Sequence, residues 1–167
     1  MDSGVGHTKK ETMKQVDITP CYFVPFPLLP HGFQYPLTYV RFVESGVPQL
    51  EPWVFLMRFQ VEEPHSLPNG LRERYPKRKL VPFSTRIDND DVACFDALEK
   101  LNDRTVLIIH DFASPGWELR GEFPDFNEWL AMAKSESLEY YKDQWDSMSK
   151  EERLKSLDDY RADTESK

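Results

Sequence analysis

The clearest hydrophobic period in the chain lies in residues 123–134, with the sequence FPDFNEWLAMAK. Four apolar residues there recur at the i, i+3, i+4 and i+7 spacing of one helical face: Phe126, Trp129, Leu130 and Ala133. Proline and aspartate at positions 124 and 125 suit a first helical turn. The pattern predicts a helix here. Residues 135–167 have helical composition and a weaker period, which predicts one or two amphipathic helices laid on the surface.

Apolar runs of strand length precede this helix. Residues 53–59 (WVFLMRF) are almost continuously apolar, which predicts a strand buried on both faces. Three more strands are predicted at residues 79–83, 92–95 and 105–111. Because the connections between the last three are short and rich in turn residues, we expect an antiparallel meander.

The first half of the chain is broken by prolines. Residues 1–18 are polar and predict a flexible arm. Residues 21–29 (CYFVPFPLL) predict an edge strand or an extended packing segment, because two prolines interrupt them. Residues 35–46 predict a short helix with Pro36 in its first turn and Gly46 at its end. Residues 62–78 hold three prolines, an asparagine and a glycine, and predict a long exposed loop.

Together these elements predict an α+β fold: a single, mostly antiparallel sheet with helices packed on one side, plus a C-terminal helical extension. At 167 residues the chain fits one domain. We divide it into a flexible polar arm (1–18), the α+β domain (19–134) and the helical extension (135–167).

Charge narrows the choice of partners. The chain has 29 acidic and 21 basic residues, for a net charge of −8. A negative field of this size repels nucleic acids and anionic membranes and attracts basic proteins, although acidity also serves solubility. Eleven carboxylates fall in residues 84–128, directly after a short basic run in residues 72–79. We therefore predict a protein partner, no nucleic acid and no membrane.

Residues that could carry chemistry are few. Cys21 and Cys94 sit in apolar runs without a CxxC or Cys/His cluster, which predicts buried, reduced thiols, no metal and a cytoplasmic location. No phosphate-binding glycine motif is present, so no cofactor is predicted. Neither a secretory leader nor a membrane-length apolar segment is seen. His110 lies next to Asp111, but adjacent strand residues point to opposite faces, which favours a structural histidine over a catalytic one.

Aromatic residues set among charged ones are a further pattern. Trp117 follows a Ser-Pro-Gly turn in the acidic half, while Tyr141 and Trp145 fall on one stripe of the C-terminal helical segment. Such side chains either anchor a protein–protein interface or cap a small core. Both interpretations stay open for these three residues.

Several short motifs of the second half resemble the SUKH superfamily, the Smi/Knr-like proteins. They are VPF at residues 81–83, DDVACFD at 90–96, VLIIHD at 106–111 and FPDFNEWL at 123–130, with PLTY at 36–39 and ESG at 44–46 upstream. The similarity spans residues 30–134. The resemblance implies an α+β fold without enzymatic activity. Bacterial members are commonly immunity proteins that bind and neutralise a toxin, often a nuclease, and fungal members act as scaffolds.

These observations predict a non-enzymatic protein that neutralises a basic, nuclease-type toxin. The predicted partner-binding residues are Asp88, Asp90, Asp91, Asp96, Asp111, Trp117, Glu118, Tyr141 and Trp145. Two alternatives stay open: a regulatory scaffold that binds through Tyr141 and Trp145, and a hydrolase that uses His110 with a nearby carboxylate. The sequence leaves the oligomeric state undecided.

Overall fold

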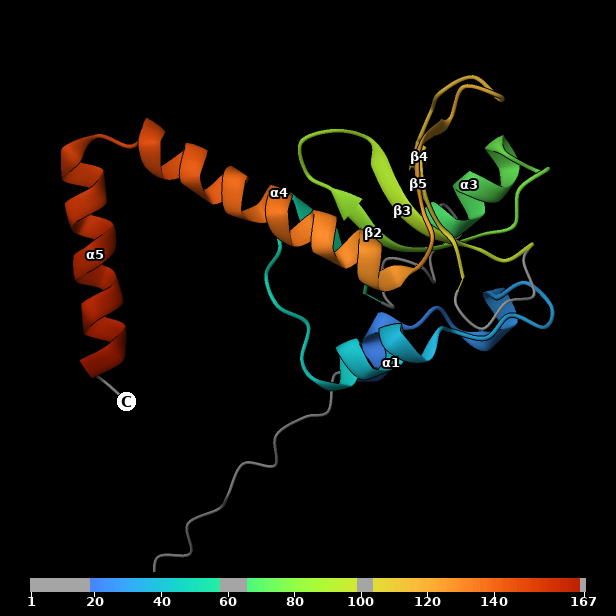
Figure 1. The fold of residues 1–167 in the computed structure, drawn as a ribbon, viewed down its shortest axis with the longest axis horizontal. Coiled ribbons are helices and arrows are strands. Elements are labelled where there is room, and N and C mark those ends of the chain that lie inside the picture. The colour runs from blue at the N-terminus through green and yellow to red at the C-terminus, as the bar shows by residue number, and fades with distance from the viewer. Residues whose placement is uncertain (1–18, 58–65, 99–103, 166–167) are drawn as a thin grey trace, which may run out of the picture.

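A computed structural model of the protein describes residues 19–57, 66–98 and 104–165 (Figure 1). Five antiparallel strands form its centre. The strands are β1 (Trp53–Phe55), β2 (Leu80–Arg86), β3 (Asp91–Asp96), β4 (Val106–His110) and β5 (Leu119–Phe123). Their order in the sheet is β1-β2-β3-β4-β5, and every neighbouring pair is antiparallel. The predicted meander and the α+β class are confirmed.

Helices flank this sheet. They are the 3₁₀ turns η1 (Thr19–Tyr22) and η2 (Phe26–Leu28), and the α-helices α1 (Leu37–Glu44), α3 (Leu67–Arg74), α4 (Phe126–Ser147) and α5 (Lys150–Glu165). Helix α1 begins after Pro36 and is followed by Gly46, whose φ of 96° suits the left-handed turn that ends a helix. Helix α4 is capped at its N-terminus by Asp125, whose carboxylate accepts a 3.0 Å hydrogen bond from the Glu128 amide.

Both faces of the central strands β2, β3 and β4 are buried, which explains why these strands have continuous rather than alternating apolar sequences. Ala93, Phe95, Val106 and Ile108 belong to the larger core, together with residues of α1 and α4. Val92, Cys94, Leu107 and Ile109 belong to a second cluster, which Leu71 of α3 and Tyr75 complete. Helices were predicted on one side of the sheet; α1 and α4 lie there, and α3 covers the opposite face.

Aromatic rings fill the larger core. The Phe83 and Phe95 rings stack at 4.4 Å, and the Trp129 ring meets Phe83 edge-on at 4.8 Å. All four apolar positions predicted for the face of α4 are buried: Phe126, Trp129, Leu130 and Ala133. Burial of such large side chains contributes about 2 to 3 kcal/mol each relative to exposure, so this contact fixes the start of α4 on the sheet.

The predictions for the proline-rich half are partly wrong. The edge strand considered for residues 21–29 is replaced by 3₁₀ turns at Thr19–Tyr22 and Phe26–Leu28, because Pro25 and Pro27 set φ angles that favour tight turns and remove backbone donors. The alternative of an extended packing segment agrees with the short stretch between the turns, where Val24 is buried in the core. The predicted loop at residues 62–78 contains α3, which Pro68 can enter because it lies in the first turn. The burial of Leu71 holds α3 on the sheet despite the poor helix propensity of its sequence.

The sheet edges also differ from expectation. Strand β1 is only three residues long, and Val54 points to solvent, so the predicted burial on both faces is wrong there. Residues 58–65 lie outside the described residues, as does the predicted N-terminal arm at 1–18. Strand β5 was not predicted, because LRGEF has little apolar content, and it forms the other edge of the sheet.

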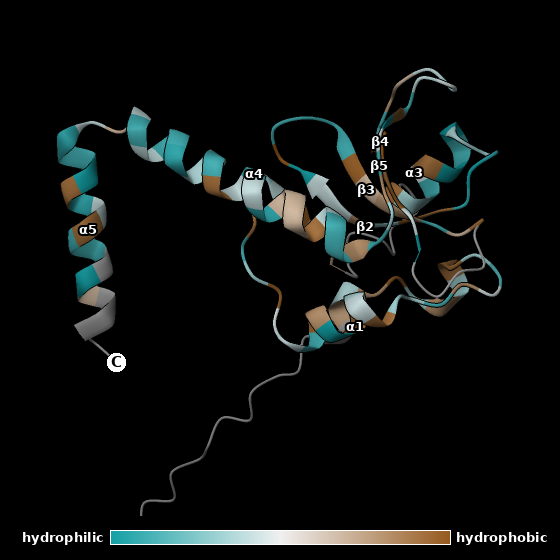
Figure 2. Ribbon diagram, viewed as in Figure 1, coloured by the Kyte–Doolittle hydropathy of each residue, from teal (hydrophilic) through white to brown (hydrophobic). Residues whose placement is uncertain are grey.

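The C-terminal helices extend away from the sheet instead of lying on its surface. Helix α4 leaves the body after its buried first half, and α5 turns away at a corner (Figure 1). No residue of 138–159 is buried, and the helix surface there is hydrophilic with isolated apolar bands (Figure 2). No helix in the described part of the chain has the length and apolarity needed to cross a bilayer.

Candidate functional site

Two turns meet at one end of the meander, and we call them together the loop end. They are the β2–β3 turn (residues 87–90) and the β4–β5 loop (residues 111–118). The register pairs Asp91 with His110, which places both turns at the same end of the sheet. The Asp111 amide donates a 2.8 Å hydrogen bond to the Asp90 carbonyl oxygen and joins the two turns.

A buried ion pair fixes the start of the β4–β5 loop. The Arg74 guanidinium, at the end of α3, donates two hydrogen bonds to the Asp111 carboxylate, at 2.7 and 2.6 Å. Asp111 is only 5% exposed, while the Arg74 side chain keeps partial contact with solvent. Two-point pairing of this kind sets orientation as well as distance, so it holds the loop against α3.

A second ion pair fixes the other end of the loop. The Arg78 guanidinium donates a 2.5 Å hydrogen bond to Glu118, which is 4% exposed and also accepts a 2.5 Å bond from the Gly116 amide. Burial disfavours the ionised form of Glu118, but these hydrogen bonds outweigh it and hold the pKa of its carboxyl below the ordinary value. The loop is therefore fastened at both ends.

Between the two ion pairs, the β4–β5 loop exposes two aromatic side chains to solvent. Phe112 is 71% exposed and Trp117 is 81% exposed. Phe112 has a φ of 63°, a left-handed conformation that costs a non-glycine residue about 1 to 2 kcal/mol. The Arg74 guanidinium lies 4.3 Å from the centre of the Phe112 ring and partly offsets that cost. Strain and exposure in one residue are typical of functional positions.

A groove lies beside the loop. It has a volume of about 570 Å³ and runs between the end of α3 and the β4–β5 loop. Its apolar lining includes Tyr75, Pro76, Leu98 and Pro115. The Tyr75 hydroxyl donates to the carbonyl oxygens of His110 (3.2 Å) and Ala113 (3.0 Å), which keeps this wall in place. The groove has room for an apolar side chain of another protein.

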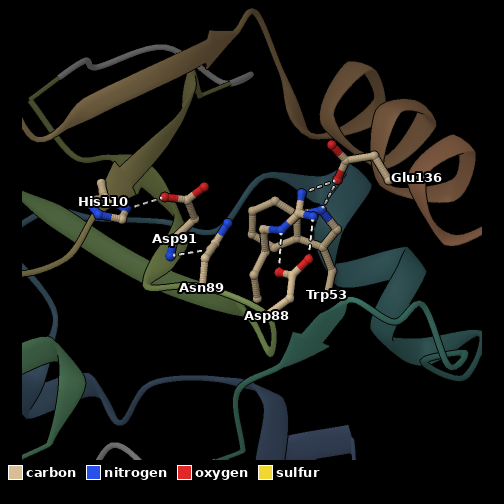
Figure 3. Close-up of polar contacts among 7 residues, drawn as sticks. Trp53, Asp88, Asn89, Asp91, His110 and Glu136 are labelled. Atoms are coloured by element: carbon tan, nitrogen blue, oxygen red, sulfur yellow. Dashed lines mark hydrogen bonds and ion pairs between the residues drawn. The ribbon is translucent and has the colours of Figure 1, made fainter. Parts of the chain in front are cut away.

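The β2–β3 turn is braced by a second polar cluster (Figure 3). The Arg86 guanidinium bonds both oxygens of Asp88, at 2.8 and 2.9 Å, and also bonds Glu136 of α4 at 2.7 Å. The Trp53 indole N–H donates to the same Glu136 oxygen at 2.7 Å. Hydrogen bonding from Arg86 lowers the pKa of Asp88. The cluster ties strands β1 and β2 to α4 and holds the acidic turn rigid.

His110 pairs with Asp91 rather than with its sequence neighbour Asp111. The His110 Nδ1 atom lies 2.8 Å from Asp91 Oδ1, across neighbouring strands (Figure 3). The predicted opposite orientation of residues 110 and 111 is confirmed, since Asp111 faces Arg74. The hydrolase alternative needs His110 in an open cleft with a partner within hydrogen-bond reach, and Asp91 supplies such a partner.

The nine predicted partner-binding residues fall in three separate places. Five lie at the loop end, and Asp91 follows it directly as the first residue of β3; the five are Asp88, Asp90, Asp111, Trp117 and Glu118. Asp96 lies at the opposite end of β3, where its carboxylate accepts a 2.8 Å hydrogen bond from the Leu98 amide. Tyr141 and Trp145 lie on the distal half of α4, where the Tyr141 hydroxyl donates to the Glu51 carboxylate. Asp111 and Glu118 were predicted as surface groups, but burial in ion pairs makes them supports of the loop.

Four residues that matter at the loop end were not among the predicted partner-binding residues. Phe112 is exposed on the β4–β5 loop. Arg74 and Arg78 hold the loop, and Ile87 is exposed on the β2–β3 turn. A signal for the two arginines was present, because a basic run directly precedes the acidic half of the chain. From the sequence, the basic run and the acidic half were interpreted as surface charges. In the structure, two arginines of the basic run, Arg74 and Arg78, form ion pairs with Asp111 and Glu118.

Among residues 19–57, 66–98 and 104–165, no three His, Cys, Asp or Glu side chains gather as a metal ion requires. Cys94 is buried as predicted, and burial raises the pKa of its thiol well above the ordinary value. Cys21 is only partly buried, and neither cysteine forms a disulfide.

Comparison with known proteins adds no assignment: no family model, no curated protein and no solved structure matches this chain. The resemblance to the SUKH superfamily therefore stays a prediction from the sequence.

Proposed function

We propose that this chain is a non-enzymatic binding protein that neutralises a basic, nuclease-type toxin domain, and that the loop end is its binding surface. The observation that carries the proposal is the pair of exposed aromatic side chains, Phe112 and Trp117, on a loop fastened by two buried ion pairs. Exposed aromatic residues on a rigid support make strong interface anchors, because little conformational entropy is lost on binding.

Charge supports a basic partner. The chain has a net charge of −8, and Asp88 and Asp90 lie exposed on the turn that is hydrogen-bonded to the aromatic loop. Nuclease domains tend to be basic because they bind phosphates, so an acidic surface speeds their association and favours them over acidic competitors. The resemblance to immunity proteins of the SUKH superfamily points to the same class of partner.

The first test is capture of partners from the native lysate at low and at high salt. We expect one basic protein with nuclease activity, held more weakly at high salt. Purified and assayed on DNA and RNA, it should lose activity when the wild-type chain is added. Trp117→Ala should weaken its binding by at least about tenfold, a hot-spot effect.

Leu157→Ala is the matched control, because Leu157 is an exposed apolar residue far along the chain, on α5. It should bind the captured nuclease as the wild type does. A captured nuclease that stays active, or that binds the Trp117→Ala variant equally well, would contradict the proposal. Capture of signalling proteins that need Tyr141 and Trp145 would favour the scaffold alternative instead.

The hydrolase alternative has one specific observation in its favour, the 2.8 Å contact of His110 with Asp91. Hydrolysis of ester and phosphoester test substrates that is lost in a His110→Gln variant would establish it. An equal, background rate for the wild type and the variant would leave the pair a structural link between β3 and β4.

A further inference from the structure

The C-terminal arm, defined here as residues 138–165, is the second surface with uncovered apolar residues. Five large apolar side chains of the arm are exposed: Leu138, Tyr141, Trp145, Leu154 and Leu157. The first three follow the i, i+3, i+7 spacing of a helix–helix seam. Helix α5 carries Leu154 and Leu157, three residues apart. Neither half of the arm rests on the sheet (Figure 1).

The corner between α4 and α5 is a built feature rather than a frayed end. The Ser149 hydroxyl accepts a 3.2 Å bond from the Glu152 amide, and the Glu152 carboxylate accepts a 2.7 Å bond from the Ser149 amide. This reciprocal pair is a capping box, which specifies where a helix begins. Hydrogen bonding from Ser149 lowers the pKa of Glu152.

Arg153 closes the corner from the other side. Its guanidinium donates to the carbonyl oxygens of Trp145 (2.8 Å) and Asp146 (2.9 Å), which cap the last turn of α4. It also lies 5.6 Å from the centre of the Trp145 ring. These contacts hold α5 at an angle to α4, and Leu138, Leu154 and Leu157 stay exposed.

The arm therefore keeps an ordered shape while its apolar residues face water. A 16-residue helix is only marginally stable in water by itself, and no residue of 150–159 in α5 is buried. Burial of its leucines against another chain would supply the missing stabilisation. The seam on α4 is helical in spacing, so its complement is a helix with apolar residues at i, i+3 and i+7.

The net charge of the arm indicates which kind of partner helix it attracts. Nine carboxylates lie in the arm against five cations, a net charge of −4. A second copy of the arm would bring two such charges together, and an acidic helix would be repelled in the same way. A helix with a basic polar face would be attracted.

From these observations we propose that the C-terminal arm is a docking surface for a basic amphipathic helix of another protein. The proposal concerns a surface separate from the loop end and does not rest on the proposed function. Apolar side chains of the partner helix pack on the seam and on Leu154 and Leu157, and its lysines or arginines face the carboxylates of the arm.

The test uses a synthetic amphipathic peptide of leucine and lysine, about 18 residues long, with leucines on one helical face. Its binding to the full chain is measured by isothermal titration calorimetry. We expect binding that weakens as salt rises, and that falls by at least about tenfold in the Leu154→Gln/Leu157→Gln double variant. A matching peptide with glutamate in place of lysine should not bind.

The control is a Phe26→Gln/Leu37→Gln double variant, which replaces two exposed apolar residues outside both the arm and the loop end. It should bind the lysine peptide as the wild type does, and circular dichroism checks that both variants keep their helices. The proposal is overturned if the peptide fails to bind the wild type, or binds both double variants equally. It is also overturned if sedimentation shows a dimer that the Leu154→Gln/Leu157→Gln variant dissolves, since a second copy then covers the arm.

Discussion

The loop end and the C-terminal arm both expose large apolar side chains, but they are supported in opposite ways. At the loop end, Phe112 and Trp117 stand on a loop whose ends are fixed by buried ion pairs to α3 and the following segment. In the arm, Leu138, Tyr141 and Trp145 stand on a helix that has left the body of the protein. One surface is backed by the core, and the other is held mainly by hydrogen bonds at its own corner.

Exposed aromatic residues are therefore expected to bind partners in different ways, depending on how firmly the protein holds them in place. A rigid support implies that the binding conformation exists before the partner arrives, so the loop end should bind without reorganisation. A helix with few tertiary contacts gains order when a partner covers it, so binding to the arm should be coupled to helix stabilisation. The predictions below test the two supports, beginning with the larger effect.

Arg74→Ala should give the largest effect. Removal of the guanidinium leaves the buried Asp111 carboxylate without its ion pair and Phe112 without its cation contact. Loss of one partner from a buried pair typically costs about 3 kcal/mol of unfolding free energy. Urea denaturation followed by tryptophan fluorescence measures the change.

Arg72→Ala is the matched control on the same helix. Its guanidinium donates one 3.0 Å bond to the Leu28 carbonyl oxygen at an exposed position, so its loss should cost no more than about 1 kcal/mol. Equal effects of the two substitutions would show that the Arg74–Asp111 pair does not support the loop.

Helix α3 and the two ion pairs that support the loop end are also the features that could not be predicted from the sequence. The helical period of residues 126–133 was sufficient to predict α4, and the apolar runs were sufficient to predict the antiparallel meander. In both cases the residues that the local pattern marks as apolar are the ones that the fold buries. Helix α3 could not be predicted, since its stability comes from the burial of Leu71 against strands that follow it in the chain. The same holds for the ion pairs, whose partners are separated by 37 and 40 residues.

The second prediction is a pH dependence that resides at the loop end. The folded pKa of Glu118 lies below its unfolded value, so ionised Glu118 stabilises the fold. That stabilisation is complete above the ordinary glutamate pKa of about 4.3 and is lost as the pH falls through the lower folded value. Hydrogen bonds to a charged group contribute about 1.5 to 3 kcal/mol.

The measurement is urea denaturation at pH 7 and at about pH 3, for the wild type and for Glu118→Gln. The variant should be less stable than the wild type at pH 7, and the difference should shrink at the lower pH, because glutamine cannot ionise. A difference that stays constant with pH would place the stabilisation elsewhere. Other carboxylates, including Asp88, also lose their contribution at low pH, so only the difference between the two proteins is informative.

The smallest effect is expected at the arm. A chain that ends at Met148 lacks α5 and its corner but keeps every buried residue of α4. Because no described residue of α5 is buried, its removal should change the unfolding free energy by less than about 0.5 kcal/mol, while the helical signal in circular dichroism falls. A loss of about 2 kcal/mol or more would show that α5 packs on the body in solution. With a small loss, the leucines of α5 contribute nothing to folding, and a partner remains the physical reason for their exposure on an ordered helix.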